Sequence, residues 1–400
     1  MASWQELELP TFKGVAGWEF TELKNFDLAA YETAGVGDLL AADQADLVFD
    51  LPAEGVRMTQ VDGSYHPVDE QESDPAHPLI MPLSQAVETH GELVDKWLGS
   101  VVEAGENVFT ARNAAEWAGG AFVYVPAGVK VEAPIVLTAV QATARTALNW
   151  RVLIVLEEGA EAEVWEQYAS TEPGLFTTVV ELVVGENANL RFVSGQGLSE
   201  ESWVFGTQRA KVDRNGKLDW VVLGFGAGNG KIFQNTILEG EGAEGKVTGA
   251  YALGGRQHLD FDTTQEHAAA HCVSDLAFRG ILNGRASAVW RGMIKVDPGA
   301  QQTDAFQESR NLLLSKRAHA DAIPGLEILA NDVRCTHAAA IAQIDPEQLF
   351  YLRARGLSQE VASRLVIEGF LAELVERFEE GPVRDALAGA LERRLAVVLG

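Results

Sequence analysis

The spacing of hydrophobic side chains changes twice along the chain. Before about residue 104, apolar residues recur at three- and four-residue steps between Val87 and Val102, after a proline-rich loop expected at 74–78. From 105 to 343 the period falls to two, in short runs rich in valine, isoleucine, threonine and aromatic residues. Helical spacing then returns. We therefore predict a separate, partly helical N-terminal region over 1–104, a β core over 105–343 and a helical region over 344–400.

Turn signals divide the β core at nearly regular intervals. Strand-like runs such as 152–156 and 179–184 are followed by turns that contain glycine or asparagine, and several successive gaps are close to thirty residues. This spacing is typical of a solenoid, in which each turn buries its apolar face against its neighbours. The repeats share little beyond strand, turn and strand. A β-solenoid is therefore our interpretation, and a β-sandwich is the alternative.

Start and stop signals divide the last region into helices. The Asp-Pro pair at 345–346 supplies an N-cap and a proline at the first helical position, and Gly356 ends that helix. Ser358 can cap the next helix, and the Gly-Pro pair at 381–382 separates it from the last one. Such helices either cap the β domain or dock a partner, and the pattern alone leaves both readings open.

Composition narrows the classes of partner. The chain has 31 Lys and Arg against 58 Asp and Glu, a net charge of −27, which repels nucleic acid and anionic membrane surfaces. No apolar run approaches a membrane span, and no basic-then-apolar leader begins the chain. The two cysteines, Cys272 and Cys335, are too far apart for a disulfide framework or a CxxC metal site to be inferred. We expect a cytoplasmic protein.

Candidate catalytic and nucleotide motifs are weak. The glycine-rich stretch 224–230 lacks the GxxxxGK[ST] pattern and a following helix, so we expect no nucleotide bound by this chain. No nucleophile motif occurs either, and we predict that the chain is not an enzyme. His258, His267 and His271 form a cluster in which a four-residue step would put the last two on one face. A metal site is one interpretation of this cluster, and ordinary packing is the other.

Four segments near the C-terminus carry a specific resemblance. They are NLLLS at 311–315, PGLEI at 324–328, DVRCTH at 332–337 and LFYLRARG at 349–356. The whole stretch 299–378 resembles the C-terminal part of the SufB/SufD family of iron-sulfur cluster assembly scaffold proteins. Weaker similarity reaches 120–137 and 17–21. The resemblance implies a mainly β protein with a right-handed parallel β-helix (solenoid) core, flanked by N-terminal and C-terminal helical regions.

Within that family the chain resembles the SufD-like members. SufB-like chains carry a cysteine where Ser309 stands and a carboxylate where Ala338 stands, whereas CTH at 335–337 is similar to the Cys-Ser-His of SufD-like chains. The SufD-like pattern has glycine at the positions of Ala338 and Ala342, so the backbone after His337 is expected to depart from that pattern.

The resemblance also implies a function. It describes a non-catalytic scaffold subunit of a SUF-type complex that pairs with a SufB-like paralogue through its core and docks a SufC-like ABC ATPase on its C-terminal helices. A transient iron-sulfur cluster would form at the subunit interface, with Cys335 and His337 as candidate ligands. These two residues are two apart and would share one face of a strand. The candidate ATPase-docking residues are Leu349, Phe350, Tyr351, Arg355, Phe370 and Phe378.

Two further expectations concern alternatives to this assembly. A solenoid face made for a paralogue is expected to pair with itself in isolation, which would give a homodimer. From a different class of protein, an extracellular-type β-helix polysaccharide hydrolase or lyase is the alternative function. The acidic residues are spread without the discriminating pair of carboxylates that such an enzyme uses.

Overall fold

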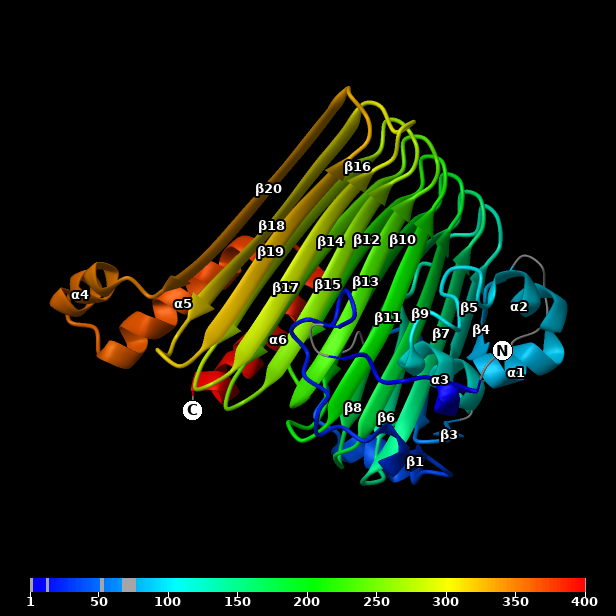
Figure 1. The fold of residues 1–400 in the computed structure, drawn as a ribbon, viewed down its shortest axis with the longest axis horizontal. Helices are drawn as coiled ribbons and strands as arrows, with labels where there is room; N and C mark the ends of the chain where they lie inside the picture. The colour runs from blue at the N-terminus through cyan, green and yellow to red at the C-terminus, as the bar shows by residue number, and fades with distance from the viewer. Residues whose placement is uncertain (1–2, 12–13, 51–53, 67–76, 400) are drawn as a thin grey trace.

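A parallel β-solenoid of about eight turns occupies residues 121–343 (Figure 1). The computed structural model describes the 400-residue chain except for residues 1–2, 12–13, 51–53, 67–76 and 400. Helices lie at the C-terminus, and shorter ones lie N-terminal to the solenoid. The predicted β-helix core with flanking helical regions is thus confirmed, and the β-sandwich alternative is wrong.

Each turn of the solenoid gives one strand to each of two parallel sheets. Sheet 1 contains β5 (Ala121–Val125), β7 (Thr146–Leu156), β9 (Leu175–Val184), β11 (Trp203–Val212), β13 (Asn229–Leu238), β15 (His258–His267), β17 (Ser287–Val296) and β19 (His319–Ile328). Sheet 2 contains β6 (Ile135–Gln141), β8 (Glu161–Ser170), β10 (Asn189–Gly197), β12 (Lys217–Gly224), β14 (Glu244–Leu253), β16 (Val273–Leu282), β18 (Thr303–Leu313) and β20 (Val333–Gln343). Paired residues are 26 apart at Trp203 and Asn229 and 32 apart at Ser287 and His319, as the near-thirty spacing predicts.

The core lies between the two sheets. Alternate residues of each strand point inward, where one continuous cluster includes the buried rings of Trp150, Trp220 and Trp290. Burial of each large apolar side chain contributes about 1.5–3 kcal/mol, and neighbouring turns must stack to achieve it. The outer faces are also apolar in places, because the flanking regions cover them.

The same left-handed backbone conformation recurs at one corner of successive turns. The residues Gly159, Asn187, Asn215, Gly242, His271 and Gln302 have φ between 53° and 74°. Each backbone N–H donates to a carbonyl of the next turn, as Asn187 N does to Arg214 O at 2.8 Å. The following residue is small and buried in every case: Ala160, Ala188, Gly216, Ala243, Cys272 and Thr303. Positive φ favours glycine and asparagine, which explains the spacing of the turn signals.

The described part of the first 104 residues joins the sheets of the solenoid through strand pairing, so it does not form the separate module that we expected. β1 (Glu32–Thr33) pairs with β7, β2 (Val56–Val61) pairs with β6, β3 (Ser64–Tyr65) pairs with β2 and β4 (Leu79–Pro82) pairs with β5. The helical elements are η1 (Trp4–Glu6), η2 (Leu28–Ala30), η3 (Leu39–Gln44), α1 (Leu83–Thr89), α2 (Gly91–Trp97) and, just beyond this region, α3 (Val108–Glu116). The apolar stripe of residues 87–102 is therefore split at His90. The loop expected at 74–78 lies mostly outside the described residues.

The C-terminal region forms α4 (Pro346–Ala354), α5 (Gln359–Val375) and α6 (Pro382–Leu399). Asp345 accepts a hydrogen bond from Glu347 N, and Ser358 accepts one from Val361 N, so both predicted N-caps are confirmed. α5 and α6 bury their apolar faces against the outer face of sheet 2. α4 projects beyond the solenoid (Figure 1) and has no buried residue. No helix among the described residues has the length and hydropathy needed to cross a bilayer.

Candidate functional site at the open end of the solenoid

The two ends of the solenoid differ. At one end, β3 and β4 are short and run antiparallel to their neighbours. At the other end, β19 and β20 are the edge strands of sheets 1 and 2 (Figure 1). Each therefore presents a row of backbone N–H and C=O groups that is not used within its own sheet. We call this end, formed by β19 and β20, the open end.

The two metal-ligand candidates lie together on β20 at the open end. Cys335 pairs in register with Ala305, and His337 pairs with Gln307. Ala305 and Gln307 are fully buried and face the interior, so Cys335 and His337 also face the interior side of the last turn. Cys335 is half-buried beside Ile294 and its neighbours, whereas His337 is exposed. The predicted shared face is thus confirmed, although a ligand role remains a prediction.

The chemistry of this pair is that of an incomplete ligand set. Burial, and then the nearby Asp304 carboxylate, raise the pKa of the Cys335 thiol above its usual 9.0. The thiol is therefore protonated at neutral pH, and an incoming iron or sulfur species must displace its proton. Among the described residues, no group of three or more His, Cys, Asp and Glu side chains is arranged to hold a metal ion. A complete ligand set for iron would therefore need donors beyond Cys335 and His337.

Four partly exposed apolar side chains lie at the open end, on β19 and β20 and at the residue after β19. Leu326, Ile328, Leu329 and Ile341 are 37%, 39%, 54% and 45% exposed. Leu326 and Ile328 align in register with the buried Ile294 and Val296 of β17, so they occupy core positions that no further turn covers. Our sequence reasoning did not identify these four residues. The sequence could have indicated them by the alternating apolar residues of the last predicted turn. No further repeat follows that turn to bury these side chains.

A groove lies beside the open end, between the end of β20, α4 and α5. Its volume is about 850 Å³, and its lining includes Tyr351, Leu352, Leu365 and Phe370. The ring of Phe370 lies 5.9 Å from the guanidinium carbon of Arg279, which in turn contacts the Glu308 carboxylate at 2.6 Å. The outer wall of this groove is thus anchored to sheet 2 through ionic contacts.

The six docking candidates occupy three environments. Tyr351 and Phe370 line the groove, and Arg355 stacks over the Tyr351 ring at 4.7 Å. Phe350 is 74% exposed on α4, and Leu349 is half-buried there. Phe378 differs from all of these, because it is only 5% exposed and packs against sheet 2 beneath the Lys246 ammonium. The structure therefore brings five candidates to the groove or to α4 and places Phe378 in the helix–sheet core.

The histidine cluster does not assemble into a site. His258 contacts Ser287 Oγ through Nδ1, and His267 contacts Ser274 Oγ through Nε2, each at 2.8 Å. Burial lowers the pKa of His267 to about 4, so it is neutral. His271 is an exposed corner residue with φ 61°. The predicted shared face of His267 and His271 is wrong, because β15 ends at His267 and the chain turns there.

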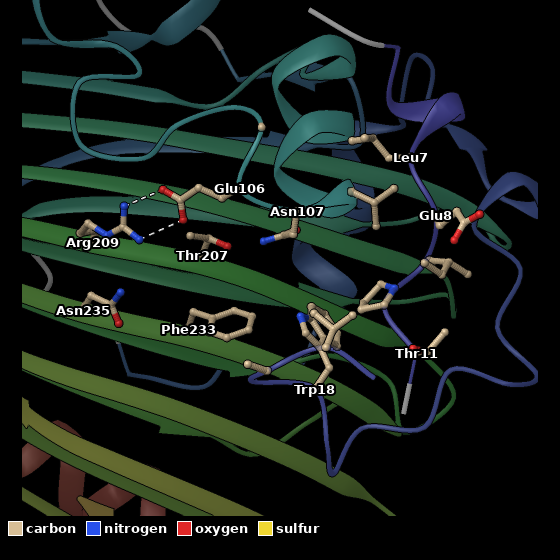
Figure 2. A pocket seen from close by; sticks show the side chains of 16 residues that line it. Leu7, Glu8, Thr11, Trp18, Glu106, Asn107, Thr207, Arg209, Phe233 and Asn235 are labelled. Atoms are coloured by element: carbon tan, nitrogen blue, oxygen red, sulfur yellow. Dashed lines mark hydrogen bonds and ion pairs between the residues drawn. The ribbon is translucent and has the colours of Figure 1, made fainter. Parts of the chain in front are cut away.

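A second hollow, of about 470 Å³, lies where the N-terminal segment crosses sheet 1. Figure 2 shows Arg209 of β11 facing Glu106, with Phe233 of β13 and Trp18 of the N-terminal segment farther along the hollow. Arg209 donates to both Glu106 oxygens, at 2.6 and 2.9 Å, and to the Val101 carbonyl. This guanidinium already binds groups of the same chain. We therefore interpret the hollow as a packing gap between the N-terminal segment and sheet 1, and not as a ligand site.

Comparison with known proteins gives a consistent result. Residues 138–370 match the family described as "SUF system FeS cluster assembly, SufBD core domain", and residues 50–137 match "SufBD protein N-terminal region". The chain is 32% identical over 389 residues to the iron-sulfur cluster assembly protein SufD of Bacillus subtilis, covering 95% of this chain and 88% of that relative. It is 29% identical over 310 residues to an iron-sulfur cluster assembly SufBD family protein of Staphylococcus aureus, covering 77% of this chain and 66% of that relative.

Proposed function

Because the chain belongs to the SufBD family of SUF-system iron-sulfur cluster assembly proteins and is SufD-like, we propose that it is a non-catalytic scaffold subunit of such an assembly complex. Its partners in this proposal are a SufB-like paralogue and a SufC-like ABC ATPase. The observation that carries the proposal is an open end that combines two edge strands, exposed core positions and two potential cluster ligands. The family match leaves the polysaccharide-cleaving alternative without support.

The open end is the proposed contact with the paralogue. Edge strands add a partner strand readily, because their free backbone groups specify its position. Leu326, Ile328 and Ile341 would lose their contact with water in such a pairing, at a gain of about 25 cal/mol per Å² of apolar surface. The same features would allow two copies of this chain to pair when the paralogue is absent.

The groove beside α4 is the proposed ATPase contact. An apolar groove next to a projecting helix with exposed aromatic rings suits the docking of a folded partner, since aromatic residues often dominate such interfaces. Phe350 and Tyr351 of α4, and Arg355 directly after it, are the residues that we expect to contact the ATPase. This chain then needs no nucleotide site of its own, because the partner supplies ATP hydrolysis.

Co-purification tests the scaffold proposal. The tagged chain is co-expressed with a SufB-like paralogue and an ABC ATPase of the same system, and the eluted complex is measured by size-exclusion chromatography with light scattering. We expect a stable complex of all three proteins. A folded chain that elutes alone in the presence of both would contradict the proposal.

A pair of histidine variants tests the proposed cluster ligand. His337→Ala is expected to leave the complex intact but to reduce the visible absorbance that develops on reconstitution with iron and sulfide. His319→Ala is the matched control, because His319 is an exposed histidine of the neighbouring strand β19 whose ring contacts Asp321. Equal absorbance in both variants would contradict a ligand role for His337 and would leave it as an ordinary interface residue.

A further inference from the structure

The interior of the solenoid carries a polar column in its middle turns. Gln208 of β11 pairs in register with Gln234 of β13, which pairs with Thr263 of β15. All three residues are 4% exposed or less and belong to the inward-facing set. Neighbouring strands lie about 4.8 Å apart, so the two amides and the hydroxyl follow each other directly inside the core.

Several atoms of this column have no protein partner. Gln234 pairs neither its Nε2 donor nor its Oε1 acceptor, and the Oε1 atoms of Gln208 and Gln265 are also unpaired. Gln265 lies in the next column, where its Nε2 donates to Thr236 Oγ1 at 3.4 Å. Buried polar groups are almost always satisfied, because an unpaired group loses its hydrogen bond to water and gains nothing in return.

The unpaired set specifies the chemistry of its ligand. It contains one amide donor and three amide oxygens, so the ligand must both accept and donate hydrogen bonds. A cation would leave the Gln234 N–H unpaired, and an anion would face three acceptor oxygens. Water has the required combination in the smallest volume, and buried water typically makes about three hydrogen bonds to such groups.

The column also connects to a buried carboxyl group. Gln208 Nε2 donates to Tyr168 Oη at 3.4 Å, and the Tyr168 hydroxyl donates to Glu166 Oε2 at 2.5 Å. Trp150 Nε1 donates to the other carboxyl oxygen at 2.8 Å. Glu166 is completely buried, and burial raises its pKa to about 7. Both protonation states of the carboxyl group are therefore populated near neutral pH, although the group has no contact with bulk solvent.

We propose that Gln208, Gln234 and Gln265 bind a small cluster of ordered water molecules inside the solenoid, and that this water lets the buried Glu166 carboxyl exchange protons with solvent. In this route the Glu166 carboxyl gives its proton to the Tyr168 oxygen while the Tyr168 hydroxyl gives its own proton to a bound water molecule. The Gln208 amide positions that water through its unpaired Oε1 and does not itself carry the proton. The proposal concerns the interior of the chain and does not depend on its partners.

Infrared spectroscopy of the full-length chain tests this site. At pH 5.5, about 1.5 units below the pKa of about 7, Glu166 is protonated, and its carbonyl band is identified by its loss in Glu166→Gln. On transfer to D₂O this band shifts as the carboxyl proton is replaced. We expect the shift to be complete at least about tenfold sooner than amide exchange in the buried strands, because internal water exchanges without unfolding of the core. A band that shifts only as slowly as those amides would overturn the proposal.

A variant pair locates the water. Gln234→Leu is expected to slow the shift of the Glu166 band by at least about tenfold, whereas Gln307→Leu, an interior change outside the cluster, should leave the rate unchanged. Equal slowing in both variants would overturn the assignment. If Gln234→Leu does not fold, a crystal structure of the parent chain decides. Density within hydrogen-bond distance of Gln234 supports the site, and amides that contact each other directly refute it.

Discussion

Two phenylalanines of the C-terminal region give opposite expectations for stability and for binding. Phe350 is 74% exposed on α4, whereas Phe378 is 5% exposed against sheet 2 with the Lys246 ammonium 4.7 Å from its ring. Phe378→Ala should lower the free energy of unfolding by about 3–5 kcal/mol, the usual cost of emptying a buried aromatic site. Phe350→Ala should change it by less than about 0.5 kcal/mol, because its ring contacts mainly solvent.

For affinity to the proposed ATPase partner, we expect the larger loss in Phe350→Ala and the smaller one in Phe378→Ala. Loss of a central aromatic residue of an interface costs about 2 kcal/mol or more, which corresponds to roughly 30-fold weaker binding. Phe350→Ala should show such a loss, and Phe378→Ala should bind like the parent chain at temperatures where it is folded. Urea unfolding followed by circular dichroism gives the stabilities, and titration calorimetry with the purified ATPase gives the affinities. Unchanged affinity in Phe350→Ala would refute the assignment of α4 as the docking element.

Three further changes test other parts of the structure. Lys231→Met leaves the buried Asp260 carboxylate without the ammonium 2.8 Å away and should cost about 3–5 kcal/mol in urea unfolding, most of which Lys231→Met/Asp260→Leu should restore. The pKa of Glu166 rises from its ordinary 4.5 to about 7 on folding, so the folded state retains a proton that the unfolded state releases. Stability should therefore fall by roughly 3 kcal/mol as pH rises from about 4.5 through 7, and this fall should be absent from denaturation curves of Glu166→Gln. Iodoacetamide should modify Cys335 in the native protein, faster at higher pH because its thiolate reacts, and should modify the fully buried Cys272 only on unfolding, as mass spectrometry can measure.

The period of the solenoid could be predicted because each turn repeats a local backbone requirement. Asn187 and Asn215 mark corners that need positive φ, and these residues are recognisable without coordinates. The same corner explains the error at His271, which holds an equivalent position with a less common residue type. Cys272 then follows as the small buried corner residue. Alignment of His271 with Asn187 and Asn215 in the repeat would have removed the metal hypothesis.

Contacts between distant segments could not be predicted in the same way. β2 joins sheet 2 through pairing with β6, and local periodicity carries no information about such a partner. In α6 the apolar face is buried against sheet 2 along the whole helix. The set of docking candidates grouped Phe370 with Phe378, although Phe370 lies on α5 and lines a groove, whereas Phe378 follows the end of α5 and packs against sheet 2. Periodicity identifies an apolar face, but it does not say whether that face packs within the chain or meets a partner.

The unequal ends of the rod limit how large an assembly it can build. β3 and β4, of two and four residues, run antiparallel to their neighbours and finish both sheets at the N-terminal end. A head-to-tail stack would have to continue a long parallel edge onto these short strands, so it lacks a matching surface. Two rods can instead meet at their open ends, where each contributes the edge strands β19 and β20. In the proposed pair neither rod would keep a free parallel edge, so assembly through the open ends would give a closed pair with a two-fold or pseudo-two-fold axis and no endless filament.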